Sequence, residues 1–255
     1  MTKLIFKVLL IVVVVVLAHT VAHNFPGRSV GYAHPELRRR GNEGRSTAST
    51  LRFVSNSHFR VIYPQSLDAE QAEAVLNILE TGRADLLQRV SVAGIRTRFP
   101  DLEIVVNETT GDFVGRTGMP PWAAAATKNN SIELQPLALL KRRGILETTL
   151  RHELVHVLTD TIGAGQTPRW FTEGMALYVA GEGRLFEKQV SSLSAEKIDR
   201  ALASAKSADE MRAAYGAAYN FVKQLIRVEG ENKVWKRLAD RSYSVKAAPI
   251  PSLTT

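Results

Sequence analysis

The sequence contains no cysteine. This absence excludes disulfide bonds, thiolate ligands for a metal ion and a lipoprotein anchor attached to cysteine. Internal repeats are also missing, and residues 24–50 are the one low-complexity block. The 255 residues are 45% apolar, which is enough to bury one good core, so the chain is neither disordered nor fibrous. We therefore expect one folded domain.

The chain is basic, with a formal net charge of +8 and a sequence pI of about 9.8. Its excess of lysine and arginine is spread along the sequence, and no nucleic-acid-binding motif accompanies it. A protein that bound anionic polymers through this charge would show a steep dependence on salt and no need for a metal. No other feature supports that function, so we expect a basic surface and no nucleic-acid partner.

Residues 1–23 have the pattern of an export signal. Lys3 and Lys7 precede an unbroken apolar run from Val8 to Ala18. The run is short for a membrane span, yet residues 4–22 approach the ~20 residues that a bilayer needs. The segment is either a cleaved signal peptide or a signal anchor, which would hold the protein at the membrane through a single N-terminal transmembrane helix. Both alternatives place the remaining chain on the periplasmic or extracellular side.

The remaining chain divides into three parts by composition. Residues 24–50 are rich in Gly, Ser, Pro and Arg and predict a flexible linker. Residues 51–241 form the predicted folded domain. Residues 242–255, which contain two prolines and little apolar periodicity, predict a flexible tail.

Apolar periodicity within the domain predicts strands first and helices afterwards. The strands are expected at residues 58–63, 102–107 and 131–135. The long loop before the third strand contains several glycines and prolines and predicts a functional flap. Helices are expected from Asp68, where Gln71 completes a capping box, and at residues 146–161, 194–205, from 207 and after 230. This order predicts an α+β fold, in which a small mixed sheet lobe precedes a mainly helical lobe and a cleft separates them.

The segment HELVH at residues 152–156 is typical of a metal site. On a helix, His152 and His156 lie one turn apart on the same face, so both imidazoles reach one ion. Glu153 lies about 100° further round the helix, beside the metal, where a base acting on water belongs. A third ligand has to come from another segment.

Glu173 is the candidate for that third ligand. Thr167 and Pro168 predict the N-cap and first position of a second helix, which carries Glu173 in its second turn. Two imidazoles and one carboxylate leave an open position for water, as in a catalytic zinc site with one ion.

Residues 170–178 read WFTEGMALY and fit the pattern W-x-x-E-G-x-A-x-Y. Together with the two histidines, this pattern resembles the gluzincin metallopeptidases, specifically the bacterial peptidase MA-like domain, over roughly residues 55–240. The resemblance implies a zincin-like fold, a zinc ion bound by His152, His156 and Glu173, and Glu153 as the catalytic base.

The sequence departs from this family at one position. Many relatives carry a carboxylate four residues after the ligand glutamate, where this chain has Leu177. Asp160, one turn beyond His156, is either a substitute that supports a ligand, or a capping or solvated residue near a helix end.

The resemblance also suggests residues for substrate binding and for stabilising the oxyanion. The segment formed by Trp122, Ala123, Ala124, Ala125 and Ala126 resembles the strand at the edge of the gluzincin cleft, where an extended peptide pairs with backbone groups. The alternative is an ordinary helical or loop alanine run. Tyr215 or Tyr219 is the candidate oxyanion donor, and core packing is the alternative for each.

These observations predict zinc-dependent hydrolysis of peptide bonds in a peptide or protein substrate. Water activated by the metal attacks the carbonyl, and Glu153 is the general base. The alternative is a catalytically inactive zinc-binding interaction domain tethered at the membrane. Leu177 favours that alternative, whereas Glu153 favours the enzyme, because a binding domain has no use for a base.

Overall fold

The computed structural model describes residues 51–128, 130–186 and 193–243. The predicted export segment, residues 1–23, and the predicted linker, residues 24–50, lie outside these ranges, as does the predicted tail after Tyr243. Within the described ranges, no helix is both long enough and apolar enough to cross a membrane.

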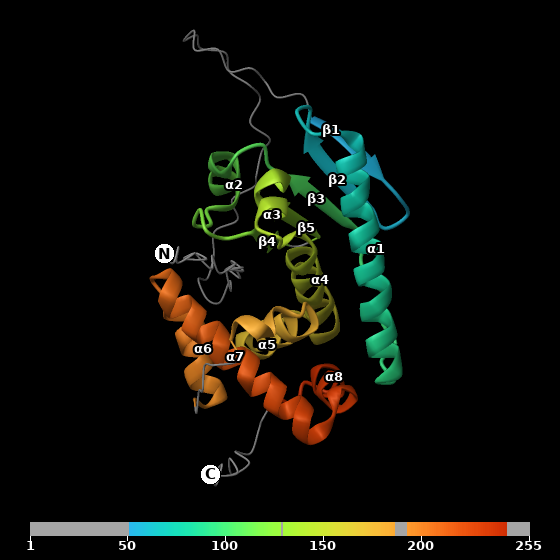
Figure 1. Ribbon diagram of the computed structural model, residues 1–255. Coiled ribbons are helices and arrows are strands. Elements are labelled where there is room, and N and C mark those ends of the chain that lie inside the picture. The colour runs from blue at the N-terminus through green and yellow to red at the C-terminus, as the bar shows by residue number, and fades with distance from the viewer. Residues whose placement is uncertain (1–50, 129, 187–192, 244–255) are drawn as a thin grey trace, which may run out of the picture.

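A five-stranded mixed sheet forms the first part of the fold (Figure 1). The strand order is β1-β2-β3-β5-β4; β2, β3 and β5 run parallel, and the two edge strands are antiparallel to their neighbours. The strands are β1 (Leu51–Ser55), β2 (Phe59–Pro64), β3 (Leu102–Val106), β4 (Ala125–Lys128) and β5 (Ser131–Leu134). The three predicted strands correspond to β2, β3 and β5, which are the inner strands. β1 was not predicted, and the start of β4 falls in the segment that was compared with a cleft-edge strand.

Two long helices contact the sheet and each other: α1 (Ala69–Val92) and α4 (Leu146–Gly163). Side chains of directly paired residues lie on the same face of a sheet. Ile104 of β3 pairs with Ile132 of β5, so the two side chains share one face, where both are fully buried. Burial of this face against the helices is the main favourable term in the folding of the sheet. The pattern explains why the inner strands were recognisable in the sequence.

The rest of the described chain is mainly helical (Figure 1). Before α4 come two short helices, α2 (Thr110–Thr117) and α3 (Leu137–Arg142). After α4 come α5 (Arg169–Val179), the 3-10 helix η1 (Glu182–Leu185), α6 (Ala195–Ser204), α7 (Ala208–Glu229) and α8 (Glu231–Ala239). The α+β class, with a mixed sheet and a mostly helical remainder, is therefore confirmed, although α1 and α2 lie between strands of the sheet.

Helix α1 begins where the sequence predicts, but the predicted capping interaction does not form. Asp68 is its N-cap residue, but the Asp68 side chain accepts no capping hydrogen bond, so the predicted capping box with Gln71 is wrong. The helix continues through Gly82, where an added Cβ would lie 2.8 Å from the Cδ1 atom of Leu154 in α4. The missing side chain lets α1 and α4 pack closely.

The predicted flap before β5 is largely ordered secondary structure. It contains α2, which begins at a capping box: the Thr109 hydroxyl accepts from the Asp112 N–H, and the Asp112 carboxylate accepts from the Thr109 N–H. The helix ends at Gly118, whose φ of 68° suits a residue without a side chain. Much of the predicted flap is therefore a capped helix and a strand.

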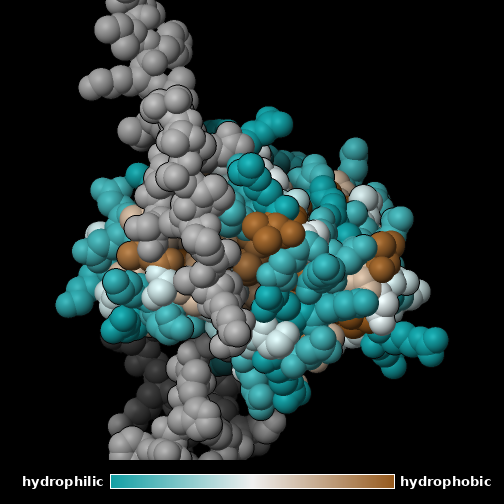
Figure 2. All heavy atoms as spheres, turned by 90° about the horizontal axis from the view of Figure 1, so that it is seen from below, coloured by the Kyte–Doolittle hydropathy of each residue, from teal (hydrophilic) through white to brown (hydrophobic). Residues whose placement is uncertain are grey.

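The surface seen from below is mostly hydrophilic, with apolar residues in small separate patches (Figure 2). Among the described residues, Phe53 of β1 is one of the exposed large apolar side chains, and the Arg60 guanidinium lies 4.3 Å from the centre of its ring. Scattered apolar residues of this kind are ordinary on a soluble surface.

Candidate metal centre

Helices α4 and α5 bring the three predicted ligands together. The ligand atoms of His152, His156 and Glu173 all lie within 4.8 Å of one another, and these three residues could hold a metal ion. The Nε2 atoms of His152 and His156 each lie 3.5 Å from the same Oε2 atom of Glu173. The two imidazole ring centres are 4.8 Å apart, as expected for histidines one turn apart on α4.

Among the described residues, the three ligand atoms of this group form no hydrogen bond with another side chain or with the backbone. The Nε2 atoms of both histidines and the Oε2 atom of Glu173 are buried and have no hydrogen-bond partner. Leaving buried polar atoms without partners costs about 1–3 kcal/mol each. A shared cation removes that cost at once, because all three atoms are ligands for it. The donor set therefore fits a metal ion.

The electrostatics of the group also favour a positive charge at its centre. Burial opposes the charged form of His152, but the carboxylates of Glu182 and Glu173 outweigh burial and raise the pKa of His152 to about 10. Burial likewise opposes the charged form of Glu173, but His156 and His152 outweigh it and lower the pKa of Glu173 to about 2. Without a metal, a proton supplies the charge that these carboxylates stabilise.

Glu182 is a buried carboxylate beside the ligand group that the sequence analysis did not single out. Its Oε2 atom lies 2.8 Å from Nδ1 of His152, and both side chains are almost completely buried. A carboxylate in this position orients a ligand histidine and increases its basicity. Glu182 is therefore placed to give His152 the support that Leu177 cannot give. It lies in η1, outside any helical spacing from the ligands, so no sequence periodicity marks it.

Glu153 is fully buried on α4 next to the ligands but is not one of the three. Its Oε2 atom accepts a hydrogen bond of 2.5 Å from the Thr127 hydroxyl, and its Oε1 atom has no hydrogen-bond partner in the described structure. Burial raises the pKa of Glu153, and the charges of His156 and His152 act against this rise. A carboxylate with raised pKa and one free oxygen has the properties of a general base.

Tertiary contacts, and not a local cap, fix the start of α5. The backbone N–H of Trp170 donates to Asp199 of α6 at 2.6 Å, while Thr167 donates to the Thr159 carbonyl instead of capping the helix. The predicted Thr167 cap is therefore wrong, because the N-cap residue is Pro168 and a carboxylate 29 residues away satisfies the helix N–H. This contact helps to hold the helix that carries Glu173.

The two candidate tyrosines differ in their surroundings. Burial raises the pKa of Tyr215 well above its ordinary value, and the nearby carboxylates of Glu173, Glu153 and Glu182 add to the rise. The Tyr215 hydroxyl therefore stays protonated beside the metal group. Tyr219 packs over η1, where an added Cβ at Gly183 would lie 2.0 Å from the Tyr219 Cζ atom, so its surroundings agree with core packing.

The predicted substrate segment leads into β4 at the edge of the sheet. Ala125 and Ala126 lie in β4, and Trp122, Ala123 and Ala124 precede it. The four alanine side chains are buried and Trp122 is partly buried, so contact with a peptide would have to come from the backbone. Ala125 and Ala126 therefore belong to a strand and not to an ordinary helical or loop alanine run.

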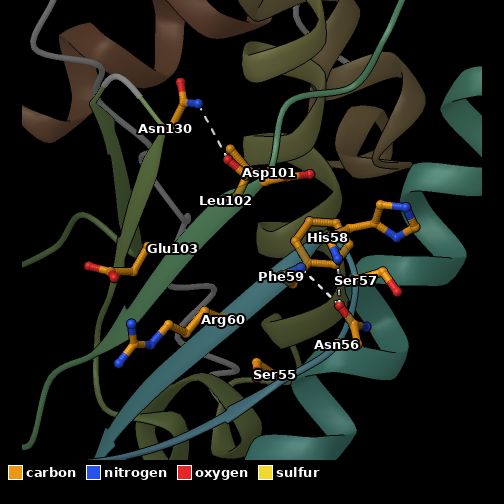
Figure 3. A pocket seen from close by; sticks show the side chains of 10 residues that line it. All are labelled: Ser55, Asn56, Ser57, His58, Phe59, Arg60, Asp101, Leu102, Glu103 and Asn130. Atoms are coloured by element: carbon orange, nitrogen blue, oxygen red, sulfur yellow. Dashed lines mark hydrogen bonds between the residues drawn. The ribbon is translucent and has the colours of Figure 1, made fainter.

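A separate pocket of about 410 Å³ lies near the turn between β1 and β2 and the start of β3 (Figure 3). None of the predicted site residues lines it. Its His58 is held by Glu80, whose Oε1 atom lies 2.8 Å from the His58 Nδ1 atom. The residues of the pocket are Ser55, Asn56, Ser57, His58, Phe59, Arg60, Asp101, Leu102, Glu103 and Asn130.

No family model matches the chain, and no curated protein matches it significantly.

Proposed function

We propose that this protein is a zinc metallopeptidase of the gluzincin type with a zincin-like fold. His152, His156 and Glu173 would hold one zinc ion, since two imidazoles and a carboxylate form the ligand set of catalytic zinc sites. The observation that carries the proposal is Glu153. It is buried beside the group, is not a ligand, and keeps one carboxylate oxygen without a partner among the described residues.

The chemistry divides between the ion and the side chains around it. When bound, zinc supplies the positive charge that polarises a peptide carbonyl and makes water reactive near neutral pH. Glu153 accepts a proton from the attacking water through Oε1 and later delivers it to the nitrogen of the leaving amine. Tyr215 remains a hydrogen-bond donor and would serve the developing oxyanion.

An extended peptide is the substrate that suits the edge of this sheet. Among the described strands, β4 pairs with β5 alone, along one side. Addition of a peptide strand to the other side would bring its backbone next to the strand that contacts Glu153 through Thr127. We place the enzyme on the exported side of the membrane, where the N-terminal segment would anchor it if it is not cleaved.

Two variants of the full chain separate metal binding from catalysis. Glu153→Gln should keep zinc, because the residue is not a ligand, but lose turnover by about 10² or more, the contribution typical of a positioned base. His156→Ala should lose both zinc and turnover, since two protein ligands are too few for a stable site. Glu147→Gln is the matched control, because Glu147 is an exposed glutamate on the same helix.

The measurements are zinc content by elemental analysis and cleavage of dye-labelled denatured casein and a quenched peptide library, with and without chelator. Equal turnover in Glu153→Gln and the parent would show that Glu153 is not the base. A parent that binds zinc but cleaves no peptide would favour an inactive zinc-binding interaction domain.

A further inference from the structure

Thr127 of β4 makes a direct contact with the proposed base. Its hydroxyl donates to the Oε2 atom of Glu153 at 2.5 Å, across 26 residues of sequence. Thr127 is 6% exposed and Glu153 is not exposed at all, so little water competes for this bond. One carboxylate oxygen is thereby fixed, while Oε1 keeps no partner in the described structure.

The register of β4 and β5 gives Thr127 a second property. The Gln135 N–H donates to the Ala124 carbonyl, and these residues are directly opposite, so they form a hydrogen-bonded pair of the antiparallel ladder. Such pairs alternate along the ladder. Ala126 is therefore bonded to β5, whereas the N–H and C=O groups of Ala125 and Thr127 point away from it, toward the free edge of the sheet.

We propose that Thr127 is a positioning residue that fixes the Glu153 carboxylate and links it to the peptide-binding edge of β4. The hydroxyl holds Oε2, so that Oε1 faces the attacking water. The backbone of the same residue belongs to the edge on which the substrate strand would lie. One residue therefore holds the base by its side chain and contributes its backbone to the edge that would receive the substrate. This inference depends on the proposed peptidase function.

A purely structural role is the alternative, because the threonine hydroxyl also satisfies a buried carboxylate oxygen. The two roles differ in which kinetic constant changes. If Thr127 positions the base, Thr127→Val should lower kcat by roughly ten-fold, the effect expected for loss of one hydrogen bond to a charged group, with KM little changed. Thr127→Ser keeps a hydroxyl and should restore most of the turnover.

A buried threonine of α4 provides the matched control. Thr159 is also fully buried, but its hydroxyl donates to the backbone carbonyl of His156 and not to a carboxylate. Thr159→Val therefore removes a buried hydroxyl while leaving Glu153 unchanged. Thr127→Ala removes the Thr127 hydroxyl without placing a methyl group against the carboxylate, and serves if Thr127→Val does not fold.

The experiment is a double-mutant cycle with the full chain. Thr127→Val is made in the parent and in Glu153→Gln, and zinc content, casein turnover and kinetics with one peptide cleaved by the parent are measured. Calorimetry then gives the affinity of that peptide for Glu153→Gln with and without Thr127→Val. We expect unchanged zinc content and peptide affinity, a loss of kcat in the parent background, and no further loss in Glu153→Gln, because residues that act together are not additive.

Equal losses in both backgrounds, or loss of zinc, would show that Thr127 acts through the fold and would overturn the inference. Full turnover of Thr127→Val beside an active parent would also overturn it, while leaving the peptidase proposal intact. A parent without turnover would instead overturn the proposed function, and this inference with it.

Discussion

Glutamine in place of Glu182 is expected to weaken zinc binding although it removes no ligand. His152 can offer its Nε2 lone pair to the ion only if its proton is on Nδ1, and that atom lies 2.8 Å from the Glu182 Oε2 atom. The carboxylate therefore selects the binding tautomer and makes the imidazole a stronger donor. Glutamine has nearly the same size, but it has no charge.

The expected loss follows from the supporting role of this contact. Removing an outer partner of a metal ligand typically lowers affinity by roughly 10- to 100-fold, or about 1.4 to 2.8 kcal/mol. Glu182→Gln should lie near the lower end, because the amide oxygen can still accept from Nδ1. Glu182→Ala should lie near the upper end, because the imidazole is 1% exposed and Nδ1 would then have no partner.

Competition with a chelator of known affinity measures this effect directly. Glu229→Gln is the control, because Glu229 forms a 2.7 Å ion pair with Arg237 between α7 and α8 and has no contact with the metal group. We expect that variant to lose some stability and keep its zinc affinity. Unchanged zinc affinity in both Glu182 variants would refute the reasoning, since it would mean that His152 needs no carboxylate to bind.

The remaining predictions concern packing and pH. Gly174→Ala should lower the free energy of unfolding by about 1–3 kcal/mol through overpacking, because the new Cβ would lie 2.4 Å from Val222 Cγ2 and 2.6 Å from the Ala218 backbone oxygen. Chemical denaturation measures it, and an unchanged midpoint would contradict the close packing of α5 on α7. In zinc-free protein, burial opposes charging of His152, but Glu182 and Glu173 raise its pKa to about 10. The stability from the protonated imidazole is therefore complete below the unfolded pKa of about 6.5 and is lost as pH rises toward 10. Thermal unfolding of chelator-treated protein should show this decline, and an equal decline in Glu182→Gln would contradict it.

The core of the metal site could be predicted because its geometry is local. On one helix, the spacing of His152 and His156 fixes their relative position whatever the rest of the fold does. Glu173 was accessible because a second helix follows a short connection. The structure brings these residues together as the spacing implies.

The supporting contacts could not be predicted because each joins segments that are distant in the sequence. Thr127 reaches Glu153 across 26 residues, and Glu182 reaches His152 across 30. Asp199 satisfies the first turn of α5 across 29 residues, which is why the local cap expected at Thr167 does not form. Local propensity is a weak guide wherever a tertiary partner competes with it.

The two edge strands of the sheet also have weak signals in the sequence. β1 has almost no buried side chain, so it lacks the alternation of apolar and polar residues that marked the inner strands. β4 begins with two alanines, which have a weak preference for strands. Pairing with an already formed neighbour defines both strands, and that pairing is not visible in either segment alone.

The choice between an enzyme and an inactive zinc-binding domain depends on what surrounds the ligands. Leu177 favours the inactive domain because many members of the family that the sequence resembles have a carboxylate at this position. Glu182 supplies a buried carboxylate to His152 from another segment, so that support for inactivity is lost. A binding domain also has no need for Glu153, whose burial raises its pKa and whose desolvation must be offset by the Thr127 bond. Under the proposed function, the Oε1 atom of Glu153, which has no hydrogen-bond partner among the described residues, is the oxygen that takes up the proton of the attacking water.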